Sequence, residues 1–184
     1  SNVQILGNSI VDAREVAIYS EFSFEGAIIA HNSVDGAALG VSVCNFNEGG
    51  RLAVVQGNLI RNLKPQRPAG SSDGAGGIGI YIEADTLVSG NNVEDAPLAA
   101  IMAGWGRYLR DVNIHGNILR KSGIGIALSV AEGAGAALIS DNIISGTQRG
   151  AIVGMDHARP VTTDLAQTGA PRYAHLEFGR NLVR

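Results

Sequence analysis

The chain of 184 residues contains a single cysteine, Cys44, so it cannot form an internal disulfide bond. Lysines are scarce as well, since Lys64 and Lys121 are the two in the chain, and the formal net charge is −3. Binding to nucleic acid or to an anionic membrane surface needs a basic patch, so we expect neither partner. No apolar run approaches the roughly 18 residues of a membrane-spanning helix, and we therefore expect no membrane insertion. Five prolines and the absence of a G-x-y period exclude a collagen-like chain.

Glycine and aliphatic residues are what the chain has in abundance. It contains 25 glycines, and 45% of its residues are hydrophobic. A composition of this kind indicates a globular domain with many tight turns, because glycine adopts backbone conformations that other residues avoid.

A repeat centred on asparagine runs through the whole sequence. The residue three positions before each asparagine and the residue two positions after it are large and apolar in every copy, as in "VNIHGNIL" at 112–119. The spacings between successive copies are 24, 26, 33, 26, 25 and 39 residues. Seven asparagines mark the repeat: Asn8, Asn32, Asn58, Asn91, Asn117, Asn142 and Asn181.

A period near 25 residues predicts a solenoid. Leucine-rich repeats share this period, but their fixed leucine pattern and helical half are missing here. Apolar residues five and three positions before the asparagine alternate as in a strand with one buried face, and a second β-branched segment follows, for example at 124–128. We therefore predict an all-β fold, a right-handed single-stranded parallel β-helix of about seven coils.

The asparagines have a structural explanation in such a fold. Stacked coils lie about 4.8 Å apart, so equivalent side-chain amides can form a hydrogen-bonded ladder along the stack. Glycine, histidine or aspartate precedes six of the seven asparagines, which suits a corner residue with positive φ. We interpret the seven asparagines as structural and not catalytic.

Two long spacings predict insertions at about 64–77 and 156–174 of a single domain that covers 1–184. The abrupt start on an apolar-patterned segment suggests a fragment of a longer protein. Insertions at the corners of a rigid solenoid are places where function can be built, although surface loops without a function are also tolerated there.

The segments after the second strand of each repeat bring aromatic residues, carboxylates and arginines into one predicted column. A tryptophan can stack on a sugar ring, an arginine can pair with a uronate carboxylate, and carboxylates can act as acid and base. The predicted ligand-binding residues are Trp105, Arg107, Tyr108, His157 and Arg159. The weaker catalytic candidates are Glu83, Asp85, Asp156 and Arg107.

The same residues also allow a purely structural interpretation. Trp105 can cover a corner of the core, and exposed ion pairs of arginine and aspartate contribute little. No zinc-ligand spacing, phosphate loop or dinucleotide fingerprint is present, so we expect no metal and no cofactor. Ca²⁺ at the carboxylates is chemically possible, but no ligand pattern supports it.

The repeat "φ-x-G-N-x-φ … G-I-x-φ", where φ is a large apolar residue, resembles the pectin-lyase-like parallel β-helix superfamily over essentially the whole chain. Three segments resemble twin-arginine-translocated repeat proteins of uncharacterised activity: "AGWGRYLRDV" at 103–112, "GIGIALSV" at 123–130 and "RGAIVGMDHARPVTTDLA" at 149–166. This resemblance implies an exported or periplasmic location, by a signal outside the sequence given. The galacturonase-type catalytic set of the wider superfamily, an N-T-D, a D-D, an H-G and an R-I-K, is absent.

Three functional hypotheses follow from these patterns. The first is an exported or surface-associated module that binds carbohydrate, with an acidic polysaccharide favoured. The second is a polysaccharide lyase or glycoside hydrolase, and the third is a structural or interaction repeat without a small ligand. The first two predict a concave groove lined by the column residues, and the third predicts that those residues pair among themselves.

Overall fold

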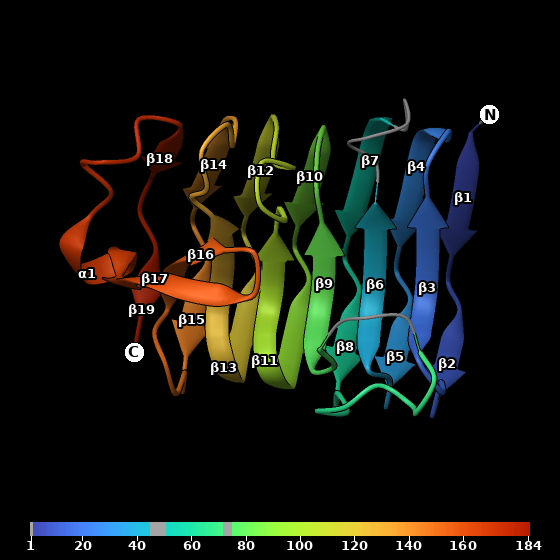
Figure 1. Cartoon of the computed structure of the whole chain (residues 1–184). Helices are drawn as coiled ribbons and strands as arrows, with labels where there is room; N and C mark the ends of the chain where they lie inside the picture. Colours follow the sequence, from blue (N-terminus) through green and yellow to red (C-terminus); the bar gives the residue numbers. More distant parts are fainter. Residues whose placement is uncertain (1, 45–50, 72–74) are drawn as a thin grey trace.

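A computed structural model describes residues 2–44, 51–71 and 75–184, and in this part of the chain the fold is all-β. The strands form two sheets, and each repeat lies beside the next in chain order from one end of the molecule to the other (Figure 1). Among the described residues every strand pair is parallel except that between β16 and β17.

The first sheet contains the strand that precedes each repeat asparagine. Its register places equivalent positions of successive repeats side by side, for example Val88 between Val55 and Ile114. Alternate residues of these strands point into the core, which explains the apolar pattern with a period of two. Its seven strands are β1 (Val3–Leu6), β4 (Glu25–Ala30), β7 (Arg51–Gln56), β10 (Thr86–Ser89), β12 (Val112–His115), β14 (Ala137–Ser140) and β18 (Leu176–Phe178).

The second sheet contains the strands that follow each asparagine. In the first three repeats a short strand and a longer one are separate, whereas β11 and β13 each run through both segments. The strands are β2 (Ser9–Val11), β3 (Val16–Glu21), β5 (Ser33–Asp35), β6 (Leu39–Cys44), β8 (Leu59–Arg61), β9 (Ile78–Ile82), β11 (Asn92–Ala103), β13 (Ile118–Ser129), β15 (Ile143–Ser145), β16 (Ile152–Asp156), β17 (Arg159–Asp164) and β19 (Leu182–Val183).

The side chains of the seven repeat asparagines form a continuous chain of hydrogen bonds between the two sheets. In the first six, Asn8 to Asn142, the Nδ2 donates to the Oδ1 of the asparagine in the next repeat at 2.9–3.0 Å. The backbone N–H of each donates to the same Oδ1 at 2.9–3.1 Å. The residue before the asparagine has a φ of 56–67° in six of the seven repeats, with Arg180 as the exception. This is the arrangement that the sequence predicts.

The core lies between the sheets and is built from the residues that flank the asparagines. Ile29, Ile60, Ile114 and Ile139 are all fully buried, while Val183 in β19 is exposed. Burial of such a side chain stabilises the fold by roughly 1.5–3 kcal/mol relative to its exposure.

Both predicted insertions pack back on the stack. The first, of which residues 72–74 lie outside the described part, is held to the first repeat by ion pairs of Lys64 with Asp12 and of Arg67 with Glu15. The second contains β17, antiparallel to β16, and the one-turn helix α1 (Leu165–Thr168). Asp164 caps α1 and also accepts hydrogen bonds from two backbone N–H groups at the start of β16.

Candidate binding groove

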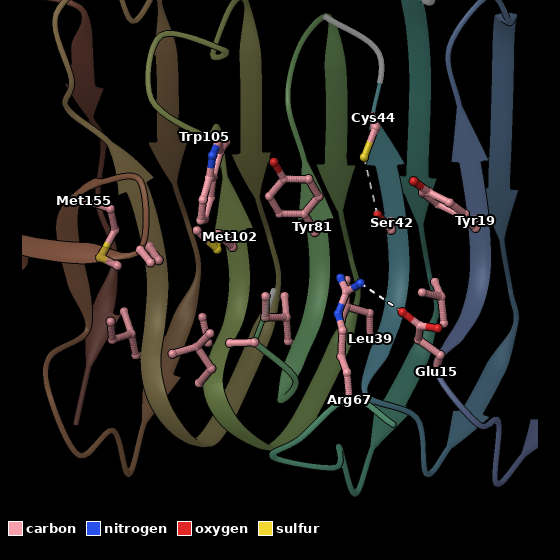
Figure 2. Close-up of a pocket in the computed structure, with 18 residues that line it drawn as sticks. Glu15, Tyr19, Leu39, Ser42, Cys44, Arg67, Tyr81, Met102, Trp105 and Met155 are labelled. Atoms are coloured by element: carbon pink, nitrogen blue, oxygen red, sulfur yellow. Dashed lines mark hydrogen bonds and ion pairs between the residues drawn. The ribbon is translucent and has the colours of Figure 1, made fainter. Parts of the chain in front are cut away.

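A cavity of about 970 Å³ lies on the outer face of the second sheet and crosses β3, β6, β9, β11, β13 and β16 (Figure 2). Two rows of side chains line it, each with one residue from each of the five strands β3, β6, β9, β11 and β13. We call the first the aliphatic row: Val16, Leu39, Ile78, Ala99 and Ile124. We call the second the mixed row: Tyr19, Ser42, Tyr81, Met102 and Ala127.

Glycine lets the strands beneath this groove approach closely. A Cβ added to Gly79 would lie 2.5 Å from the Ala100 carbonyl oxygen, and one added to Gly125 would lie 2.5 Å from that of Ala151. Because these contacts are with backbone, a larger residue at either position would displace the neighbouring strand. The spacing of strands under the groove therefore depends on these two glycines.

Trp105 stands on the wall of the groove in the turn after β11. Two backbone hydrogen bonds between Trp105 and Tyr108, of 3.1 and 3.2 Å, close this turn. The indole meets the His157 imidazole edge to face, with centroids 5.4 Å apart. Gly106 permits this approach, since a Cβ there would lie 2.5 Å from His157 Nε2.

The hydroxyl and thiol groups of the groove are protonated at neutral pH. Burial, with the nearby Glu83 carboxylate as the next cause, raises the pKa of Tyr81, whose hydroxyl donates to Glu83 Oε1 at 3.1 Å. Burial also raises the pKa of Tyr19. Burial and, after it, the nearby Glu83 carboxylate raise the pKa of the Cys44 thiol to about 11. These groups therefore offer hydrogen bonds to a ligand but no ready nucleophile.

Arg67 enters the groove from the first insertion, on the side opposite the aromatic residues (Figure 2). Its Nη1 donates to Glu15 Oε1 at 3.0 Å, and 18% of its side chain is exposed. Its Nε is buried and has no hydrogen-bond partner. A buried donor without an acceptor costs free energy, so the position of this Nε lowers the stability of the fold.

A second hollow of about 640 Å³ lies beyond Trp105 and His157. The side chains that line it include Arg107, Tyr108, Asp156, His157 and Tyr173. The Arg107 guanidinium carbon lies 5.9 Å from the centroid of the Tyr108 ring, a cation–π contact.

The structure thus brings together five of the residues predicted from sequence, with Trp105 on the groove and the other four around the second hollow. Arg159 is different, because its side chain is 74% exposed and donates to Asp156 Oδ2 at 3.0 Å. Asp156 also accepts from His157 Nδ1 at 2.8 Å, and these two contacts, His157 first, hold the pKa of Asp156 below its usual value.

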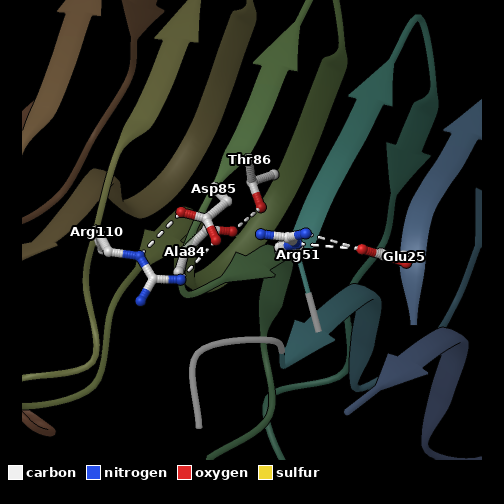
Figure 3. Close-up of polar contacts among 6 residues, drawn as sticks. All are labelled: Glu25, Arg51, Ala84, Asp85, Thr86 and Arg110. Carbon is white, nitrogen blue, oxygen red and sulfur yellow. Dashed lines mark hydrogen bonds and ion pairs between the residues drawn. The ribbon is translucent and has the colours of Figure 1, made fainter. Parts of the chain in front are cut away.

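The other catalytic candidates make specific contacts too. Asp85 accepts two hydrogen bonds from Arg110, at 2.9 and 2.5 Å, in a two-pronged ion pair (Figure 3). Glu83 accepts from Tyr81. Asp85 and Glu83 therefore have partners within the chain, as the structural interpretation of the sequence expects.

Of the residues that line the groove, only Trp105 was among those predicted from sequence. Tyr19 and Tyr81 occupy the same register position, and the similar strands "VAIYSE" and "IGIYIE" were a signal that could have identified them. Arg67 carries no such signal, because its place depends on how the insertion folds back.

Among the residues that the structure describes, no three histidines, cysteines, aspartates or glutamates come close enough to hold a metal ion. None of the helices found in this part of the chain has the length and apolar character to cross a bilayer. Comparison of the chain with family models, with curated proteins and with solved structures gives no match.

Proposed function

We propose that the chain is a right-handed parallel β-helix of about seven coils, of the pectin-lyase-like kind, and that it is an exported module that binds polysaccharide without cleaving it. The repeat register and the asparagine ladder support this fold. The observation that carries the binding function is the line of aromatic side chains along the groove: Tyr19, Tyr81 and Trp105.

The placement of these rings suits an extended polymer. Tyr19 and Tyr81 stand on strands separated by one other strand, so they are about 10 Å apart along the stack. Tyr19 is 52% exposed and Trp105 is 37% exposed, which leaves ring surface for a ligand. Because the groove runs across the strands, a sugar chain lying in it would meet one ring after another.

The contacts of the carboxylates favour binding over cleavage. A glycoside hydrolase needs two carboxyl groups on either side of the scissile bond, one of them a proton donor. Asp85 is paired with Arg110, and Asp156 is held by His157 and Arg159, which lower its pKa and make it a poor proton donor. Glu83 is hydrogen-bonded to Tyr81.

An acidic polysaccharide is the favoured ligand because the second hollow lies on the other side of the wall that Trp105 and His157 form. There Arg107 stacks on Tyr108, and within the described part of the chain it makes no ion pair. A guanidinium without an ion-pair partner can bind a uronate carboxylate through two hydrogen bonds. A chain stacked on Trp105 would bring its next carboxylate toward Arg107.

The test is calorimetric titration of the protein with neutral and acidic polysaccharides, while products are followed in the same samples. We expect binding to an acidic polymer, at least a tenfold loss in Trp105→Ala, about 1–3 kcal/mol for a lost stacking contact, and no cleavage. Phe22→Ala is the control, since Phe22 is an exposed aromatic residue outside the groove. Cleavage, or binding that Trp105→Ala leaves intact, would contradict the proposal.

A further inference from the structure

The three aromatic rings of the groove lie on a straight line along the stack. The register partners on the neighbouring strands β3, β6, β9 and β11 are Tyr19, Ser42, Tyr81 and Met102. Trp105 follows Met102 by three residues, and Figure 2 shows its indole in line with the two phenol rings. Tyr19 and Trp105 are exposed, and Tyr81 is half-buried. Rings arranged in this way favour a ligand that is itself straight.

The distances between these rings are multiples of the strand spacing. Tyr19 and Tyr81 stand two spacings apart, and β11, which leads into Trp105, lies one spacing further on, about 14 Å from β3. The strand between the tyrosines carries the small Ser42, so no third ring interrupts the gap. A sugar chain that advances by one strand spacing per residue would place its first and third sugars at the tyrosines and its fourth beside Trp105.

Contacts within the chain hold two of the rings in place before a ligand arrives. The Tyr81 hydroxyl donates to Glu83 Oε1 at 3.1 Å, and the Trp105 indole rests against the His157 imidazole with centroids 5.4 Å apart. A site that is already ordered loses little conformational freedom on binding. The spacing of the rings can therefore discriminate between ligands of different shape.

The linkage between sugars determines whether a chain can follow this line. In a β(1→4)-linked chain of equatorial linkages each sugar is flipped relative to the one before, so the chain is a straight ribbon and alternate sugars present the same face. Its advance per sugar is close to the strand spacing. An α(1→4)-linked chain of the same sugar turns in one sense at every linkage and curls away from a straight line. The ribbon meets Tyr19 and Tyr81 with one face, and the curled chain does not.

From these observations we infer that the natural ligand is a β(1→4)-linked acidic polysaccharide, bound as a straight ribbon along the stack with one sugar per strand. Tyr19 and Tyr81 stack on alternate sugars, and Trp105 contacts the next sugar on the side of the second hollow. This inference rests on the proposed binding of an acidic polysaccharide and adds the linkage class to it.

The probes are two hexasaccharides of glucuronic acid, one β(1→4)-linked and one α(1→4)-linked, together with the β(1→4)-linked disaccharide. The two hexasaccharides have the same sugar, length and charge, so a difference in affinity reports the linkage alone. In calorimetric titrations we expect the β-linked hexasaccharide to bind about tenfold or more tightly than the α-linked one, because it gains a stacking contact that the curled chain lacks. The disaccharide cannot reach from Tyr19 to Trp105, so we expect it to bind about tenfold or more weakly than the β-linked hexasaccharide.

Variants of Tyr19 test the role of the ring spacing. Tyr19 is exposed, so Tyr19→Ala is expected to fold, to weaken the β-linked hexasaccharide about tenfold or more, and to make the two linkages nearly equal in affinity. Tyr19→Phe keeps the ring and is expected to keep the preference, as is the control Phe22→Ala outside the groove. Equal affinities in the unaltered protein, or a preference that Tyr19→Ala leaves intact or Tyr19→Phe abolishes, would overturn the inference.

The two proposals fail differently. If both hexasaccharides bind with equal affinity and Trp105→Ala abolishes that binding, the proposed function stays and the linkage class is wrong. The same conclusion follows if another acidic polysaccharide binds through Trp105 while the β-linked hexasaccharide does not bind. If no acidic polysaccharide binds, both proposals are wrong.

Discussion

The indole of Trp105 and the imidazole of His157 meet edge to face, with ring planes at 85° and centroids 5.4 Å apart. Trp105 comes from the turn after β11, and His157 comes from the turn between β16 and β17. Two turns more than fifty residues apart thus share one wall, which separates the groove from the second hollow.

The first prediction concerns this wall. Replacing His157 by alanine removes one side of the contact, so the Trp105 indole becomes more exposed to water. Because Trp105 is the single tryptophan, its emission is expected to shift to longer wavelength. His115→Ala, in β12 of the other sheet, is the control and is expected to leave the emission maximum in place. An unchanged spectrum for His157→Ala would show that the contact does not shield the indole.

A second prediction compares the middle of the asparagine ladder with its end. Asn117 is fully buried, and its Oδ1 accepts from both the backbone N–H and the Nδ2 of Asn91. Asn117→Ala leaves these donors and the Val88 carbonyl without partners, so we expect a loss of about 3 kcal/mol or more. The free energy of unfolding in urea measures it.

The matched variant is Asn8→Ala, at the exposed end of the ladder. The Asn8 side chain only donates, to Asn32 Oδ1 and to the exposed Leu6 carbonyl, and Asn32 Oδ1 keeps the backbone N–H of residue 8 as a donor, so we expect a much smaller loss than for Asn117→Ala. Equal losses for the two variants would mean that burial of the amides does not determine their contribution.

A third prediction compares the stability contributed by two ion pairs, Arg110–Asp85 and Arg51–Glu25, which are both drawn in Figure 3. Arg110 donates two hydrogen bonds to Asp85, and the Asp85 side chain is only 16% exposed. Arg110→Ala is therefore expected to cost about 1–2 kcal/mol. Arg51 pairs with Glu25 where both side chains are more than half exposed, so Arg51→Ala should leave the thermal midpoint unchanged. A larger shift for Arg51→Ala than for Arg110→Ala would contradict this explanation.

The fourth prediction concerns the reactivity of Cys44. Burial and Glu83 raise the pKa of its thiol from 9.0 to about 11, so the thiolate fraction at neutral pH falls by a factor of about 100. Alkylation by iodoacetamide should be slow in the folded protein and should accelerate as the pH rises toward 11. The unfolded protein in guanidinium chloride is the control, and fast alkylation of the folded protein at neutral pH would refute the prediction.

The regular part of the fold could be predicted because each repeat obeys the same local rules. Residues such as Ile114 and Leu119 flank Asn117 at offsets that one buried face requires, and every copy keeps these offsets. The irregular part could not be predicted in this way. Nothing in the local pattern of 156–174 shows that β17 turns back antiparallel on β16 or that Asp164 serves α1 and β16 at once.

The site was predictable only where one turn supplies several of its residues. Trp105, Arg107 and Tyr108 lie within four positions of each other, so a dense mixture of residue types identified them. The groove instead draws Glu15, Tyr81 and Arg67 from segments up to 66 residues apart, and their meeting depends on the register of the stack and on the insertion. Ion-pair partners such as Arg110 for Asp85 come from the neighbouring repeat, which sequence spacing alone did not single out.

The asparagine ladder has a direction, since within it each side-chain amide oxygen accepts from the asparagine of the N-terminal repeat and each amide nitrogen donates to the oxygen of the C-terminal one. All the amide dipoles therefore add, and no rung can be reversed without breaking the bonds on both of its sides. The ladder of this protein can consequently be lengthened or shortened only by whole repeats. A whole repeat with its asparagine can be gained or lost, and every side-chain amide in the ladder still has its hydrogen bonds. Extra residues can also be inserted between two successive asparagines, as the spacings of 33 and 39 residues show. A repeat that kept its strands but lost its asparagine would divide the molecule into two shorter columns.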